Sequence, residues 1–133
     1  MLILSCGDLP FAVKSTSLSS DQRIANITVT DMSAMAMARN ILFAKIITDT
    51  KFNPDSNEDL QYLWNVWYNM EWSSVTKERF LKDITELSIG CFSDNLKVPV
   101  ENDLSVLKNI WKFWVSSVSE VNLATMQQIH KQR

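Results

Sequence analysis

The chain has 133 residues, a length typical of one domain. Its formal net charge is −2 and it has no long basic run, so binding to the phosphate backbone of a nucleic acid is disfavoured. Hydrophobic residues make up 46% of the sequence, which disfavours intrinsic disorder and favours a packed core. The two cysteines, Cys6 and Cys91, are far apart, which argues against a zinc site or a disulfide framework and for a reducing compartment.

Membrane association is not expected from the apolar runs. None approaches the roughly 18 residues of a membrane span, and residues 1–4 are shorter than the apolar region of a signal peptide. We therefore predict a cytoplasmic protein. The few glycines and prolines disfavour an all-β fold with many tight turns and favour helices.

Two parallel strands are predicted near the N-terminus. Residues 2–4 are a short apolar run, followed by a small-residue turn at residues 5–8. Residues 24–30 alternate apolar and threonine side chains towards their end, and Asp31 closes this second strand. With the helices around them, the strands predict an α/β fold with a Rossmann-like βαβα start over residues 1–50.

Two helices belong to this start. The first is predicted over residues 9–17, where Pro10 suits the first helical turn. The second begins after Ser33, a good N-cap, and reaches residue 47. It is apolar over most of its girth, as expected for a helix between a sheet and another layer. Residues 48–57 form the longest polar break in the chain.

The remainder, residues 58–133, is predicted to be mostly helical. A helix over residues 58–72 carries aromatic side chains at helical spacing. The next helix starts after Ser73 or Ser74 and ends before Gly90, a residue suited to the left-handed position past a helix end.

A loop and a last helix complete the predicted elements, within a single domain over residues 1–133. Residues 91–100 predict the loop, and apolar residues in 104–121 step by three and four, as in a coiled-coil stripe. We expect the tryptophans of this stripe to pack against those of residues 58–72, although tryptophans could instead form a binding surface. Trp72 is expected to be the most exposed of them.

The predicted sheet is incomplete. Two strands do not make a stable sheet, and both of its edges would have unpaired backbone groups. Either residues 89–100 supply a third strand, or other chain segments or a second molecule complete the sheet. A protein partner or a homo-oligomer is therefore expected.

A candidate ligand site lies where the two predicted strands end. Cys6, Gly7 and Asp8 occupy the turn where a Rossmann enzyme has its glycine loop, whose backbone N–H groups approach an anionic ligand. Asp31, roughly 20 residues further on, takes the place of the acid that binds ribose hydroxyls. The alternative is that Gly7 makes a tight turn and Asp31 caps a helix.

Side chains for catalysis are sparse. His130 is the only histidine and lies in the C-terminal tail, and neither cysteine has a base beside it. Arg39 is expected to pair with Asp8 or Asp31, a contact that would stabilise the fold as readily as bind a ligand. No catalytic residue and no metal site is predicted.

Three segments, taken in order, resemble a known family. They are residues 2–9 (LILSCGDL), residues 29–31 with 38–42 (VTD and ARNIL), and residues 63–68 (LWNVWY). They resemble the domain of unknown function at the N-terminus of certain MYND-type zinc-finger proteins and of the dynein axonemal assembly factor of the same type. The chain departs from that pattern at Ser5, where the family has a glycine, and at Pro10, and it has no MYND finger.

The resemblance implies a degenerate methyltransferase-like Rossmann unit that acts through protein contacts within larger proteins. We therefore predict a non-catalytic protein-interaction or scaffold domain of a larger assembly or oligomer, without a cofactor. The alternative is a methyltransferase-like domain that binds S-adenosylmethionine or a nucleotide through Cys6, Gly7, Asp8 and Asp31. The sequence does not favour an enzyme, and both functions stay open.

Overall fold

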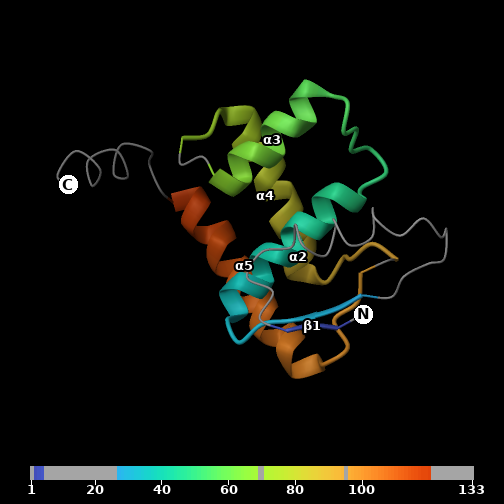
Figure 1. Cartoon of the computed structure of the whole chain (residues 1–133). Coiled ribbons are helices and arrows are strands. Elements are labelled where there is room, and N and C mark those ends of the chain that lie inside the picture. The colour runs from blue at the N-terminus through green and yellow to red at the C-terminus, as the bar shows by residue number, and fades with distance from the viewer. Residues whose placement is uncertain (1, 5–26, 69–70, 95, 121–133) are drawn as a thin grey trace, which may run out of the picture.

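The computed structural model describes residues 2–4, 27–68, 71–94 and 96–120, and over these residues the chain is mostly helical (Figure 1). The predicted helix over residues 9–17 lies outside them. The described elements, in chain order, are β1 (Leu2–Leu4), β2 (Thr28–Thr30), α2 (Ala34–Thr48), α3 (Asn57–Tyr68), α4 (Ser74–Ile89) and α5 (Glu101–Glu120).

The two strands pair in parallel and lie at one edge of the helices (Figure 1). Leu2 is opposite Thr28 and Leu4 is opposite Thr30, so the described sheet is three residues long. The described part of residues 89–100 contains no strand, so the third strand considered for that segment is not found there. Ile89 is instead the last residue of α4, and Gly90 takes the left-handed conformation, so the segment does not begin as extended backbone. The connection between β1 and β2 lies outside the described residues, so the Rossmann-like start stays a prediction.

Helix α2 begins as its sequence predicts. The Oγ of Ser33 accepts a hydrogen bond from the backbone N–H of Ala36 at 3.2 Å, which confirms Ser33 as the N-cap. Its stripe of Ala38, Ile41 and Leu42 is buried, because α2 lies against both α4 and α5. The wide apolar girth of α2 is therefore explained by the helices that cover it.

Helices α4 and α5 pack against one another and run in opposite directions (Figure 1). Ser73 is the N-cap of α4, and Gly90 ends the helix in the left-handed conformation with φ of 90°. The N–H of Gly90 donates to the carbonyl of Leu87, and the N–H of Cys91 donates to that of Glu86, both at 2.9 Å. Both predicted ends of this helix are confirmed.

One hydrophobic core joins α2, α3, α4 and α5. Trp111 of α5 is at its centre with no exposed surface, and its Nε1 donates a hydrogen bond to the carbonyl of Ala38 at 3.2 Å. The buried apolar residues are Ala38, Ile41, Leu42, Ile46, Tyr62, Phe80, Ile84, Leu87, Leu107 and Trp111.

Two expectations about the tryptophans are wrong. Trp64 of α3 was expected to pack in the core against α5, but its side chain is 60% exposed. Trp72, expected to be the most exposed, is half-buried with its ring 4.6 Å from that of Phe80. Its Nε1 donates to the carbonyl of Asn65 in α3 at 2.8 Å, so the indole of Trp72 contacts both α3 and α4.

Replacing Gly90 by alanine is expected to lower the free energy of unfolding by about 1 kcal/mol, because a Cβ is unfavourable at positive φ. The new Cβ would also meet the Nζ of Lys108 at 3.0 Å, although that flexible side chain can move. Urea unfolding measures the change. A Gly90→Asn variant should lose less, since asparagine tolerates this conformation better. An alanine variant as stable as the parent would contradict the assignment.

Candidate functional site

The site predicted at the strand ends is only partly described. Cys6, Gly7 and Asp8 lie outside the described residues. Asp31 directly follows β2, and its Oδ1 accepts a hydrogen bond from the backbone N–H of Ser33 at 2.9 Å. Asp31 thus holds the backbone just before α2, whose N-cap is Ser33, and its role in ligand binding stays a prediction. Because the strands are parallel and Leu4 pairs with Thr30, β1 and β2 end at the same edge.

Arg39 contacts an aromatic ring. Its guanidinium carbon lies 4.8 Å from the centroid of the Trp67 ring in α3. Phe43, one helical turn further along α2, places its ring 4.9 Å from the same indole, edge to face. No local pattern in the sequence predicts this stack. The pairing expected for Arg39 with Asp8 falls outside the described residues, and its pairing with Asp31 stays a prediction.

A buried polar centre joins α2, α3 and α4. The Nζ of Lys45 lies 3.0 Å from Oδ1 of Asp83 and 2.8 Å from Oε2 of Glu86. The hydroxyl of Tyr62 donates to the other oxygen of Asp83 at 2.6 Å. Arg79 lies over the ring of Tyr62, with 4.2 Å between its guanidinium carbon and the ring centroid.

The pKa values of Lys45 and Tyr62 in the polar centre, and of Asp59 beside Arg79, are shifted. Burial alone would lower the pKa of Lys45, but hydrogen bonds and charge from Glu86 and Asp83 outweigh it and raise that pKa. Burial, and then the negative charge of Asp83, raise the pKa of Tyr62. The pKa of Asp59 is lowered first by the backbone N–H of Asn53 and then by Arg79, whose Nη1 lies 2.6 Å from its Oδ1.

The polar centre contains the residue types of a catalytic cluster, but its charged groups are buried and already paired with one another. Each of its buried charges already has an oppositely charged partner, and Asp83 is engaged through both oxygens. The Lys45 and Asp83 side chains are only 10% and 13% exposed. We therefore interpret the polar centre as a structural feature that holds α2, α3 and α4 together. A lysine within the buried stripe of α2 was the one sequence signal that could have revealed it.

Alkaline solution is expected to destabilise the fold through this centre. Lys45 and Tyr62 have raised pKa values, so the folded state holds their protons more tightly than the unfolded state does. Their contribution is complete below the ordinary values of 10.5 and 10.0 and is lost as pH rises above them.

Urea unfolding at about pH 8 and about pH 11 measures this loss. A Tyr62→Phe variant should show a smaller drop between the two conditions, because it removes the phenolic proton. Stability that stays level or rises over this interval would contradict the assignment.

The outward side of α3 has an exposed apolar surface, the α3 aromatic stripe, made of Leu60, Trp64 and Tyr68. They are spaced by four residues, so they share one face of the helix. Trp64 and Tyr68 are 60% and 65% exposed, and their ring centroids are 4.6 Å apart. Trp67 contacts Tyr68 at 6.5 Å between centroids, which links the stripe to Arg39.

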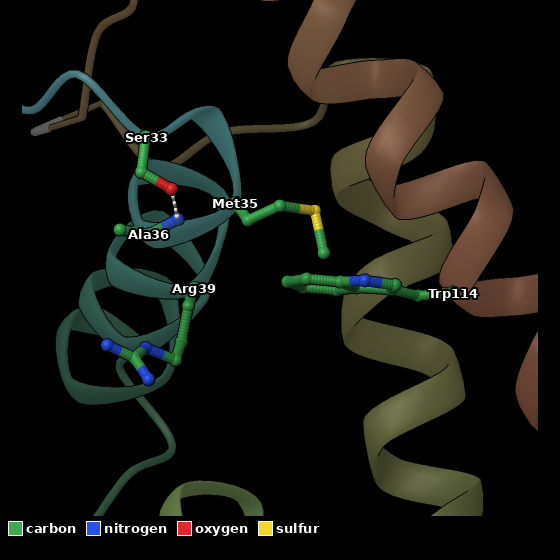
Figure 2. A pocket seen from close by; sticks show the side chains of 5 residues that line it. All are labelled: Ser33, Met35, Ala36, Arg39 and Trp114. Carbon is green, nitrogen blue, oxygen red and sulfur yellow. Dashed lines mark hydrogen bonds between the residues drawn. The ribbon is translucent and has the colours of Figure 1, made fainter.

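An open pocket lies between α2 and α5 (Figure 2). It has a volume of about 360 Å³ and is lined by Ser33, Met35, Ala36, Arg39 and Trp114. The Met35 side chain extends from α2 towards the indole of Trp114, whereas the guanidinium of Arg39 is directed away from that indole (Figure 2). The pocket thus combines an apolar wall from two helices with one cationic side chain.

Comparison with known families places the N-terminal part of the chain. Residues 1–72 match the family described as domain of unknown function DUF4470, which is more than half of the 133 residues. The chain belongs to the DUF4470 family. No curated protein and no solved structure matches it. The DUF4470 match includes α2 and α3, with Arg39 and the α3 aromatic stripe, and ends before α4 and α5.

The described part of the chain contains neither a helix suited to cross a membrane nor a cluster suited to bind a metal. None of the helices in the described ranges has the length and apolar character that a bilayer crossing requires. The same ranges bring together no set of three His, Cys, Asp or Glu side chains suited to a metal ion.

Proposed function

We propose that the chain is a non-catalytic protein-interaction domain that acts as a scaffold in a larger cytoplasmic assembly. The observation that carries this proposal is the α3 aromatic stripe, because two large aromatic side chains are exposed side by side. Tryptophan and tyrosine are enriched among the residues that dominate binding energy at protein interfaces. The resemblance to the N-terminal domain of MYND-type zinc-finger proteins and of the dynein axonemal assembly factor supports the same class of function.

The stripe also has the rigidity that favours binding. Stacking between Trp64 and Tyr68, and contact of Tyr68 with Trp67, restrain the rings before a partner arrives. Trp67 is in turn fixed by Phe43 of α2. Preorganised side chains lose less conformational entropy on association, so more of the contact energy appears as affinity.

The experiment identifies a partner and then measures it. A photo-crosslinking amino acid replaces Tyr68, or Val75 as a control, since Val75 is also exposed but lies on α4. A protein captured only from position 68 is purified and titrated. Trp64→Ala should weaken its binding at least about tenfold, and Val75→Ala should have little effect. Equal capture from both positions, or binding indifferent to Trp64→Ala, would overturn the proposal.

A second candidate is a methyltransferase-like domain that binds S-adenosylmethionine or a nucleotide. One observation favours it: β1 and β2 are parallel and end at the same edge, where Asp31 follows Thr30. Cys6, Gly7 and Asp8 follow β1 in the chain, so the Rossmann-like start would bring them to that edge. This proposal depends on that start.

Calorimetry with S-adenosylmethionine and S-adenosylhomocysteine tests the second candidate. Asp31→Asn is the appropriate variant, because an amide oxygen can still accept from the N–H of Ser33 while the charge is removed. Binding that is lost in this variant, with helix content unchanged by circular dichroism, would support the candidate. Absence of heat at millimolar ligand would reject it.

A further inference from the structure

The pocket beside α2 indicates the chemistry of the partner. We propose that the partner which binds the α3 aromatic stripe presents an acidic residue next to a large apolar side chain. The apolar side chain enters the pocket between Met35 and Trp114, and the carboxylate binds Arg39. This inference rests on the proposed protein-interaction function and adds the charge and the anchor of the partner.

The apolar half of the proposal follows from the pocket walls. The pocket has a volume of about 360 Å³, near the lower end of the roughly 300–1,000 Å³ of ligand pockets, so it suits a single large side chain. Met35 is 50% exposed and extends towards the half-buried indole of Trp114 (Figure 2). A thioether and an indole are both favourable contacts for an aliphatic or aromatic group.

The charged half of the proposal follows from Arg39. It is the cation that lines the pocket, and its side chain is exposed. Its guanidinium carries five N–H donors, so it can bind a partner carboxylate in addition to the contacts that it makes within the chain. Lying over the Trp67 ring also restricts its rotamers, which favours a defined geometry.

The pocket and the α3 aromatic stripe are linked through Arg39. Arg39 lines the pocket and lies over Trp67, and Trp67 contacts Tyr68 of the stripe. The combined surface therefore crosses α5, α2 and α3 and is rich in Trp, Tyr and Arg, the composition typical of interface hot spots. We therefore expect one partner segment to contact both the stripe and the pocket, with Arg39 between them.

The test uses a phage-displayed library of short random peptides, selected on the full chain. We expect the recovered peptides to pair Asp or Glu with a neighbouring large apolar residue. Arg39→Met keeps the apolar stem over Trp67 and should weaken these peptides about tenfold, whereas Arg39→Lys should retain part of the affinity. Lys112→Met, which removes an exposed cation on α5 outside the pocket lining, is the matched control.

The outcomes separate the two levels of the proposal. Peptides that lose affinity with Trp64→Ala but not with Arg39→Met, and that carry no shared acid, would overturn the charge inference and leave the interaction function standing. A library that yields no binder, or only binders indifferent to Trp64→Ala and to Arg39→Met, would overturn both. Thermal unfolding of each variant confirms that the chain is folded.

Discussion

Replacing Trp111 by alanine is expected to lower the free energy of unfolding by about 3–5 kcal/mol, the range for large aromatic residues in a core. Trp111 has no exposed surface, so its removal leaves a cavity where α5 meets α2. The variant also leaves the carbonyl of Ala38 without the indole N–H that donates to it at 3.2 Å. Urea denaturation followed by circular dichroism at 222 nm, a wavelength that reports helix content, measures the loss.

Phe113 supplies the matched control for this measurement. It lies two residues further along the same helix, but it is 64% exposed. Phe113→Ala should change stability by less than about 1 kcal/mol, because little apolar surface returns to water. If the two variants lost similar amounts of stability, the assignment of the core face of α5 would be wrong.

Replacing Lys45 by methionine is expected to lower the free energy of unfolding by about 3 kcal/mol, because it leaves the buried carboxylate of Asp83 without its cation. The remaining hydrogen bond from Tyr62 satisfies one oxygen only. Thermal and urea unfolding measure the change. Lys82→Met, on the exposed side of α4, should shift stability by less than about 0.5 kcal/mol.

A double variant decides whether the loss is electrostatic. Lys45→Met with Asp83→Asn removes both charges and keeps an amide oxygen that can accept from Tyr62. It should recover much of the lost stability, because an isolated buried charge is more costly than an absent pair. A double variant that is no more stable than Lys45→Met would show that the unpaired charge of Asp83 is not what destabilises Lys45→Met.

Much of the helical architecture could be predicted because local signals determine it. Ser33 and Ser73 accept hydrogen bonds from the first turns of α2 and α4, and Gly90 takes the left-handed conformation at the end of α4. These residues act through neighbours three or four positions away, so sequence alone reveals them. The loop expected at residues 91–100 is also without helix or strand wherever it is described.

Long-range pairing could not be predicted in the same way. Trp64 and Trp111 both lie at helical spacing among apolar residues, yet only Trp111 is buried. The difference depends on how α3 docks on α4, which no local pattern contains. The ion pair of Lys45 with Asp83 joins residues 38 positions apart, and the stack of Arg39 on Trp67 likewise crosses between helices. At the strand-end site, Cys6, Gly7 and Asp8 lie outside the described residues, so their role in binding stays a prediction.

The hydrogen bond from Trp111 to Ala38 spans 73 positions of the chain, and it bears on how the protein folds during synthesis. Residues 1–72, the DUF4470 match, leave the ribosome before α4 and α5 exist. Until then the stripe of Ala38, Ile41 and Leu42 on α2 has no cover from those two helices. The nascent chain therefore passes through a stage with exposed apolar surface, when it is most open to aggregation and to capture by chaperones. Completion of α5 ends that stage.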